Sequence, residues 1–288
     1  MKILIPVDFS NASRNAAYYA SEMASGIDAE VFLLNMLFAE AIPHVAIVDT
    51  EGLADATVEA TSQNCIQLIE ELREKNENLN FSFKSINDNS LSQMQMIEKS
   101  ASDNGIDLIV IGEKGVSGIE RMVFGSNAAS LISDSNIPVI TVPEHARFNG
   151  IKNLVYLSDL LNIEEELARL ISFNKFLKAH IHILHTILPD SKENPKKDIV
   201  KDLLTRYKSS GISYQISLQN NLVDSMEEFI KTVKADLVVM FTHVTPFFEM
   251  TSHKSVMREI AFYSSIPVLS LKSKIQEEQI ESVLNYLE

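Results

Sequence analysis

Short apolar runs alternate along the first half of the chain with longer segments whose apolar residues recur at helical spacing. The predicted strands cover residues Ile3–Val7, Val31–Leu37, Phe81–Ile86, Leu108–Ile111 and Val139–Val142. The predicted helices cover residues Ser10–Ser25, the region of Ile66–Leu72, Leu91–Ser102 and Ser126–Ser133, and Ser10 is expected to cap the first. Strands that alternate with helices in this way indicate right-handed βαβ units and a parallel sheet with helices on both faces.

The alternation occurs twice in the chain. Lys2–Asp8 aligns with Lys152–Ser158 at an offset of 150 residues, and Asp107–Ile111 aligns with Asp236–Met240 at an offset of 129. A repeat this long is no solenoid, whose period is about 20–50 residues. We therefore predict two domains, residues 1–146 and 147–288, each built on a five-stranded parallel sheet.

The composition excludes several classes of protein. With 45% hydrophobic and 22% charged residues among 288, the chain is typical of globular proteins rather than disordered ones. No apolar run approaches the roughly 18–20 residues that span a bilayer, and Ile3–Val7 is too short for a signal-peptide core, so we expect a cytoplasmic protein. The single cysteine, Cys65, excludes an intrachain disulfide and is expected to be a buried core thiol.

The net charge of −14 is concentrated in the first half. Residues 1–146 hold 8 Lys/Arg against 21 Asp/Glu, whereas residues 147–288 hold 17 against 18. Neither half has the excess of basic residues that binds a phosphate backbone, so nucleic acid is not an expected partner. An anion bound in the acidic half must be held mainly by backbone dipoles.

A glycine-rich stretch follows the apolar run Leu108–Ile111. Gly112 and Gly115 come first, and Gly125-Ser126 opens a segment with helical spacing. Glycine lets backbone N–H groups approach an anion, and a helix N-terminus adds unpaired donors and a partial positive charge. Ligands of open parallel sheets bind beyond the carboxyl ends of the strands, where the strand order reverses. We therefore expect the glycines and Asp8 to lie in one crevice.

With these motifs the chain resembles the universal stress protein family in its tandem two-domain form. Nucleotide-binding members carry Gly, two residues, Gly, nine residues and Gly-Ser/Thr, a spacing that Gly112, Gly115 and Gly125-Ser126 match without adjustment. The opening Ile5–Ser10 and the closing pairs Pro138-Val139 and Pro267-Val268 also match. The resemblance covers essentially the whole chain. It implies two tandem Rossmann-like domains of the adenine nucleotide alpha hydrolase-like type.

The resemblance further implies that the first domain binds ATP or another adenine nucleotide, with or without Mg²⁺. The output would be a stress-response or signalling change in conformation or in binding to a protein partner. It also implies that Val139–Val142 and Val268–Leu271 meet, which would make the two domains an internal pseudo-dimer, and a homodimer is a further possibility. The implied nucleotide-binding residues are Pro6, Val7, Asp8, Met36, Ile111, Gly112, Lys114, Gly115, Gly125, Ser126 and Asn127.

Each of these signals also has an ordinary structural interpretation. Turns use glycine freely, Asp8 could cap the helix that follows it, and Lys114 could be a solvated loop residue. His180, His182 and His185 resemble a metal site, but on a strand the first two face one side and the third faces the other. We interpret them as ordinary strand histidines.

The second half departs from the nucleotide-binding pattern. At the offset of 129, Phe241 replaces Gly112, and at the offset of 150, Ser158 replaces Asp8 with Asp159 one place late. The other replacements are Val244, Phe247 and Lys254 for Gly115, Gly118 and Gly125. Because such side chains deny the backbone approach that phosphates need, we predict a degenerate second domain that has lost the nucleotide.

No catalytic motif accompanies the glycine pattern. A P-loop has Gly-Lys-Ser/Thr, whereas no lysine separates Gly125 from Ser126. No Walker-B carboxylate, kinase catalytic loop or nucleophile elbow is recognisable. The sequence therefore favours a nucleotide-binding signalling protein over an enzyme. A slow ATPase and a structural interaction module that binds no nucleotide are the alternatives.

Overall fold

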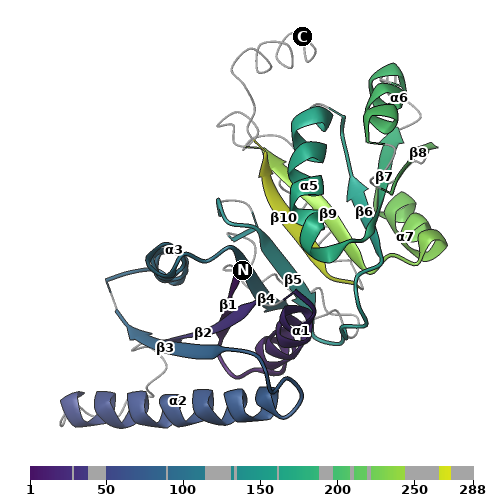
Figure 1. The fold of residues 1–288 in the computed structure, drawn as a ribbon. Coiled ribbons are helices and arrows are strands. Elements are labelled where there is room, and N and C mark those ends of the chain that lie inside the picture. The colour runs from purple at the N-terminus through teal and green to yellow at the C-terminus, as the bar shows by residue number, and fades with distance from the viewer. Residues whose placement is uncertain are drawn as a thin grey trace. The chain divides into compact units, whose positions relative to one another are not determined.

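The structure is a computed structural model that describes residues 1–27, 29–37, 50–88, 90–113, 131–132, 135–160, 162–187, 197–207, 211–218, 222–243 and 266–273. The chain divides into two compact units, Met1–Phe148 and Asn149–Glu288 (Figure 1). This division lies close to the one expected after residue 146. The predicted meeting of the two closing strands concerns the relation between the units and stays a prediction.

The first unit is a parallel sheet with helices on both faces. In the order β3-β2-β1-β4-β5, every described strand pair is parallel. Helices α1 and α2 lie on one side of the sheet and α3 lies on the other (Figure 1). The elements are β1 (Lys2–Val7), α1 (Asn11–Ile27), β2 (Glu30–Leu37), α2 (Thr50–Arg73), β3 (Phe81–Asn87), α3 (Gln93–Asn104), β4 (Leu108–Glu113) and β5 (Val139–Pro143).

The strand order reverses between β1 and β4, and the two strands are paired only near their amino ends. The register between them consists of Ile3–Leu108 and Leu4–Ile109. By contrast, β1 pairs with β2 along its whole length, to Val7–Asn35. The carboxyl ends of β1 and β4 therefore sit at the topological switch point, where open α/β sheets bind ligands.

Alternation along the strands sorts the core into two layers. Leu4 and Ile109 belong to a buried cluster with Ile97 of α3, and Met36 and Ile111 pack against that cluster. Since successive side chains of a strand point to opposite faces, the alternate residues of these strands face α1 and α2. Both layers are fully buried. An exposed fraction of 0% is found for Ile3, Leu4, Ile5 and Ile109.

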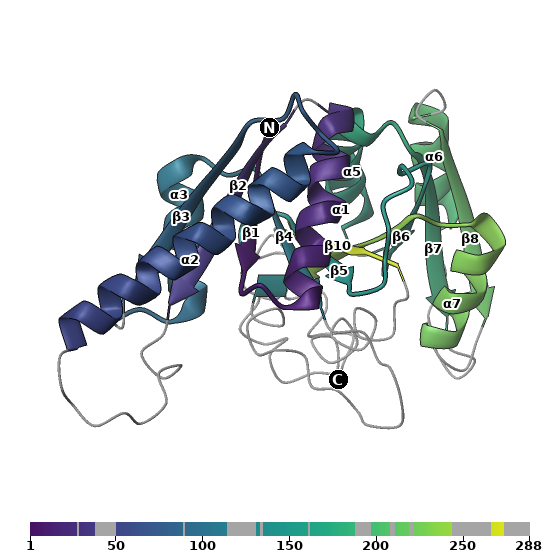
Figure 2. The same ribbon diagram turned by 90° about the horizontal axis from the view of Figure 1, so that it is seen from below.

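The second unit repeats this topology. Its strand order is β10-β9-β6-β7-β8, and all described pairs are again parallel (Figure 1). Figure 2 shows β6, β7 and β8 of this sheet from below. The order is that of the first unit, because β6, β7, β8, β9 and β10 take the places of β1 to β5. The elements are β6 (Asn153–Leu157), α5 (Ile163–Leu177), β7 (His180–Ile187), α6 (Lys197–Arg206), β8 (Ile212–Leu218), α7 (Leu222–Val233), β9 (Leu237–His243) and β10 (Val268–Ser273).

The structural correspondence between β1 and β6 corrects the sequence alignment by one residue. In the first unit, the backbone N–H of Lys2 donates to Asp107 Oδ2 and the N–H of Asp107 donates to the Lys2 carbonyl. In the second unit, Asn153 makes both bonds with Asp236, whereas Lys152 makes only the first of them. Asp159 therefore occupies the place of Asp8. Our assignment of Ser158 to that place was wrong, because an ungapped alignment of apolar strands cannot detect a slip of one residue.

Two further expectations concern the whole chain. Cys65 is fully buried, as predicted, and burial raises the pKa of its thiol to about 11. Among the residues that the structure describes, no helix combines the length and the apolar character needed to cross a membrane.

Candidate functional site

The turn after β1 is built by short polar side chains. Ser10 Oγ accepts the backbone N–H of Ser13 at 3.3 Å, which makes Ser10 the N-cap of α1, as predicted. Asp8 Oδ1 accepts the backbone N–H of Ser10 at 3.0 Å, and Phe9 between them has a φ of 62°. Since Ser10 provides the cap, Asp8 stabilises the turn itself and leaves its exposed carboxylate at the end of the strand.

The electrostatics of this turn favour an ionised Asp8. Partial burial acts to raise the pKa of its carboxyl group, but hydrogen bonds with Ser10 and Ser13 outweigh that effect and lower the pKa below its usual value. At neutral pH Asp8 therefore presents a carboxylate, which only accepts hydrogen bonds. Such a group suits hydroxyl or N–H donors.

An apolar surface flanks Asp8 on the α3 side of the sheet. Met36 at the end of β2 and Ile111 near the end of β4 are partly buried and pack on the same core cluster. Pro6 pairs with Leu34, a member of that cluster, and so faces the same side. Three of the predicted binding residues, Pro6, Met36 and Ile111, thus share one face of the sheet at its carboxyl edge.

Gly112 has a packing role on the opposite face. A Cβ added there would lie 2.1 Å from the carbonyl oxygen of Ala12 and 2.8 Å from the backbone nitrogen of Ser13. The first turn of α1 therefore packs directly against the backbone of β4. Gly112 therefore has a packing role within β4 rather than in a turn, and its contact with a ligand stays a prediction.

The sequence analysis missed Asn35, which lies in β2 beside the end of β1. Its Nδ2 donates to the carbonyl oxygen of Val7 at 2.7 Å, and its side chain is 4% exposed. Its Oδ1 is buried without a hydrogen-bond partner among the described residues. The signal in the sequence was one polar residue within the apolar run Val31–Leu37.

A second residue that the sequence analysis missed is Glu113, the last residue of β4. Its side chain is partly buried, and burial raises the pKa of its carboxyl group to about 8. In the part of the chain that the structure describes, this carboxyl group makes no hydrogen bond or ion pair. By alternation it lies on the face of Ile111, the face of the apolar surface.

The remaining predicted binding residues lie outside the described residues. They are Lys114, Gly115, Gly125, Ser126 and Asn127. The same holds for Val244, Phe247 and Lys254, the residues that replace the later glycines in the second half.

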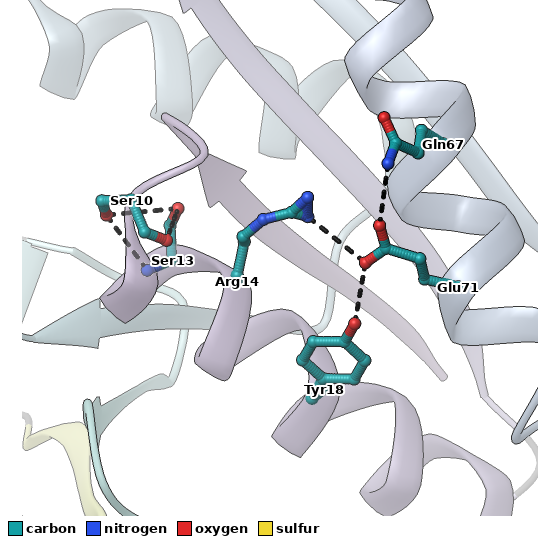
Figure 3. Close-up of polar contacts among 6 residues, drawn as sticks. All are labelled: Ser10, Ser13, Arg14, Tyr18, Gln67 and Glu71. Atoms are coloured by element: carbon teal, nitrogen blue, oxygen red, sulfur yellow. Dashed lines mark hydrogen bonds and ion pairs between the residues drawn. The ribbon is translucent and has the colours of Figure 1, made fainter.

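A polar network fixes the start of α1 against α2 (Figure 3). Arg14 Nη1 lies 3.3 Å from Glu71 Oε2, and the hydroxyl of Tyr18 donates to the same oxygen at 2.8 Å. Gln67 Nε2 donates to Glu71 Oε1 at 3.2 Å. Both oxygens of Glu71 are therefore engaged, and the helix whose first turn carries Ser10 is tied to its neighbour.

The second unit keeps the hydrogen bond between its second strand and the end of its first strand, but a different side chain makes it. His185 Nδ1 lies 2.8 Å from the carbonyl oxygen of Ser158, as Asn35 Nδ2 lies beside that of Val7. Leu160 has a φ of 61°, matching Phe9, so the turn after the first strand is retained.

The position of Gly112 also differs between the two units. Phe241 stands there, is 6% exposed and packs edge-to-face on Tyr156, with ring centroids 5.5 Å apart. The Tyr156 hydroxyl in turn donates to the buried carboxylate of Glu166 on α5. The second unit thus fills with side chains the space where the first has a direct backbone contact.

The histidines of β7 divide as predicted. The rings of His180 and His182 are 4.4 Å apart on one side of the strand, while His185 lies buried on the other. Both ring nitrogens of His182 are engaged, Nδ1 with Ser213 Oγ at 2.8 Å and Nε2 with Asn153 Oδ1 at 3.3 Å. These two bonds support the interpretation of His182 as an ordinary strand histidine.

Comparison with known proteins decides the family. The model of the universal stress protein family matches residues 1–143. Residues 1–143, about half of the chain, belong to the universal stress protein family.

Two universal stress proteins of Methanocaldococcus jannaschii are each 28% identical to this family member, over 141 and 152 residues. Each alignment covers 49% of this chain, and it covers 81% of the first archaeal protein and 93% of the second. A crystal structure of a universal stress protein from Archaeoglobus fulgidus matches 94% of this chain and 98% of its own, with a TM-score of 0.71 and 16% identity. That likeness shows the fold of this universal stress protein.

Proposed function

We propose that the first unit binds an adenine nucleotide at the carboxyl ends of β1, β2 and β4, and that the bound nucleotide changes the conformation or the partner binding of the protein. One observation carries this proposal. The strand order reverses between β1 and β4, and the glycine spacing typical of the family's nucleotide-binding members begins at Gly112, on the end of β4.

The apolar surface suits the base. Met36 and Ile111 are partly buried side chains on one face of the sheet, and Pro6 lies between them in the strand order. A flat purine ring gains free energy by covering such a surface, at roughly 25 cal/mol per Å² of apolar area removed from water. The backbone at Val7 and Met36 supplies polar groups for the edge of the base.

Asp8 suits the ribose. Its carboxylate is ionised at neutral pH and exposed at the end of β1. Acidic side chains near such strand ends accept hydrogen bonds from ribose hydroxyls in dinucleotide-binding folds. In this proposal Asp8 selects a nucleoside over a free base.

The glycine loop would hold the phosphates. We assign Gly112, Lys114 and Gly115 to the first part of this phosphate-binding loop. We assign Gly125, Ser126 and Asn127 to the helix N-terminus that follows it. The acidic character of residues 1–146 leaves little long-range attraction for an anion, so these backbone N–H groups supply most of the binding. ATP is the nucleotide that the resemblance favours, and Mg²⁺ would bind through its phosphates.

We further propose one nucleotide per chain. Phe241 stands in place of Gly112, so the second unit lacks the first glycine of the phosphate-binding pattern. Its role in this proposal is to support the first unit or to bind the protein partner.

Nucleotide released by denaturing the purified full-length protein should be identified by mass spectrometry, and calorimetric titration should give one site per chain. Gly115→Val should abolish binding, because the new side chain blocks backbone approach to the phosphates. Gly26→Val is the matched control, since a Cβ at Gly26 meets nothing within 4 Å. Two equivalent sites per chain, or unaltered binding by Gly115→Val, would contradict the proposal.

Hydrolysis requires a separate measurement. Without a recognisable general base or arginine finger, we expect ATP turnover far below the 1–100 s⁻¹ typical of kinases. Turnover within that range that is lost in Asp8→Ala would make the protein an enzyme instead.

A further inference from the structure

Glu113 places a carboxyl group where the proposed nucleotide would carry its negative charge. It directly follows Gly112, the first glycine of the pattern, and it lies on the face of Ile111 and Met36. If the register of β1 and β4 is continued to their ends, Asp8 aligns with Glu113. An ionised Glu113 would therefore meet both the phosphates and a second carboxylate.

The charged groups on the elements around β4 do not compensate Glu113. Asp8 ends β1, and Glu144 after β5 donates its backbone N–H to the Glu113 carbonyl at 2.8 Å. Arg14 on α1 is paired with Glu71. The others are His145 after β5 and the exposed Glu98, Lys99 and Asp103 of α3; Lys114, Glu120 and Arg121 follow in the sequence, outside the described residues.

Burial of a carboxyl group without a cation or a donor favours its protonated form over its ionised form. Protonated, it is neutral and can donate a hydrogen bond to a phosphate or ribose oxygen. Ionised, it can only accept, and the phosphate oxygens of a nucleotide repel it. The two states therefore have opposite effects on the same ligand.

We propose that Glu113 is part of the nucleotide site and binds the nucleotide in its protonated form, so that loss of its proton releases the nucleotide. The inference rests on the proposed function of the first unit. It makes nucleotide occupancy respond to pH in the mildly alkaline range, because burial raises the pKa of Glu113 to about 8.

The sign and size of the effect follow from a single proton. Below the pKa the site is neutral at Glu113 and binds; above it, each pH unit weakens apparent binding up to tenfold. Between pH 7 and pH 9 the dissociation constant for ATP should rise about tenfold. The ionisation of the ATP phosphates is the same for the wild type and for Glu113→Gln, so the difference between the two proteins reports the proton of Glu113.

The test is calorimetric titration of the full-length protein with ATP from pH 7 to pH 9. The wild type should lose about tenfold in affinity, whereas Glu113→Gln, a mimic of the neutral acid, should bind with the same affinity across the range. At pH 8 the wild type should also take up about half a proton per nucleotide bound, measured in buffers of different ionisation enthalpy, and Glu113→Gln should take up none.

Glu144→Gln is the matched control and should keep the wild-type pH dependence, because it removes a neighbouring acid that the proposal does not use. Circular dichroism at each pH separates loss of binding from loss of fold. An equal pH dependence in wild type and Glu113→Gln, or a pH-independent wild type, overturns the inference and leaves the proposed function standing. Absence of ATP binding at every pH in every variant overturns the proposed function itself.

Discussion

Gly112 and Ala12 are in direct backbone contact: a Cβ on Gly112 would lie 2.1 Å from the carbonyl oxygen of Ala12. This contact seats the first turn of α1 on the end of β4. The same turn carries Ser10, whose N–H bonds to Asp8, so the contact also fixes the position of the Asp8 carboxylate. One glycine thus joins the packing of the first unit to the geometry of its candidate site.

Gly112→Ala should destabilise the protein by about 1–3 kcal/mol, because the added methyl group forces α1 away from the sheet. Urea denaturation followed by circular dichroism measures the loss. Gly26→Ala, the control, should be neutral or stabilise α1 by up to about 1 kcal/mol, since its Cβ meets open space. A Gly112→Ala protein as stable as the wild type would show that α1 moves without cost.

The sequence predicted the strands of the first unit well, because each is a short apolar run between polar breaks. The ends of the helices were harder to predict. The third helix was expected from Leu91, but it begins at Gln93 behind a capping box in which Ser92 and Gln95 bond reciprocally. The motif Ser-x-x-Gln is readable in the sequence and would have given the correct start.

The Asn35–Val7 hydrogen bond predicts a charge-sensitive site. Asn35→Asp keeps the shape of the side chain but replaces the Nδ2 donor with an oxygen that faces the carbonyl of Val7. With this residue 4% exposed, the loss at pH 7 should be at least the roughly 1–3 kcal/mol of an unsatisfied buried group. It should shrink at low pH, where the new carboxyl group is protonated and can donate.

Asn35→His is the matched control for that variant, because His185 makes the equivalent bond to Ser158 in the second unit. It should retain most of the stability in thermal unfolding. If Asn35→Asp proves as stable as Asn35→His at pH 7, the Val7 bond contributes nothing measurable.

The candidate site was only partly predictable for a physical reason. The approximate end of a strand can be seen in the hydrophobic pattern, so Asp8, just after β1, and Gly112, near the end of β4, were predicted to lie at the site. Which face a polar side chain takes, and whether it finds a partner, depends on packing between distant segments. Asn35 and Glu113 gain their properties from burial, and the one-residue shift of β6 becomes visible in the structure, for example in the backbone bonds of Asn153 and Asp236.

In the second unit, Tyr156→Phe should destabilise the protein by about 1–3 kcal/mol, since the buried carboxylate of Glu166 loses the hydroxyl that donates to it. The double variant Tyr156→Phe/Glu166→Leu removes both polar groups and should recover part of that loss. Chemical denaturation of the four proteins in this cycle measures their coupling. Additive single effects would mean that the Tyr156–Glu166 bond does not stabilise the fold.

The nucleotide-free protein should show the proton of Glu113 in its stability. The pKa of this group is raised from 4.5 to about 8 on folding, so the folded state holds a proton that the unfolded state has released between these pH values. Stability should therefore fall as the pH rises through this window, by at most about 1.4 kcal/mol per pH unit from this group. Glu113→Gln removes the contribution, so its free energy of unfolding should exceed that of the wild type increasingly from pH 5 to pH 8 and by a constant amount above pH 8.

Urea titrations at intervals of half a pH unit test this prediction, with Glu144→Gln as the control that should follow the wild type. A difference between wild type and Glu113→Gln that does not change with pH would mean that Glu113 ionises normally in the folded protein.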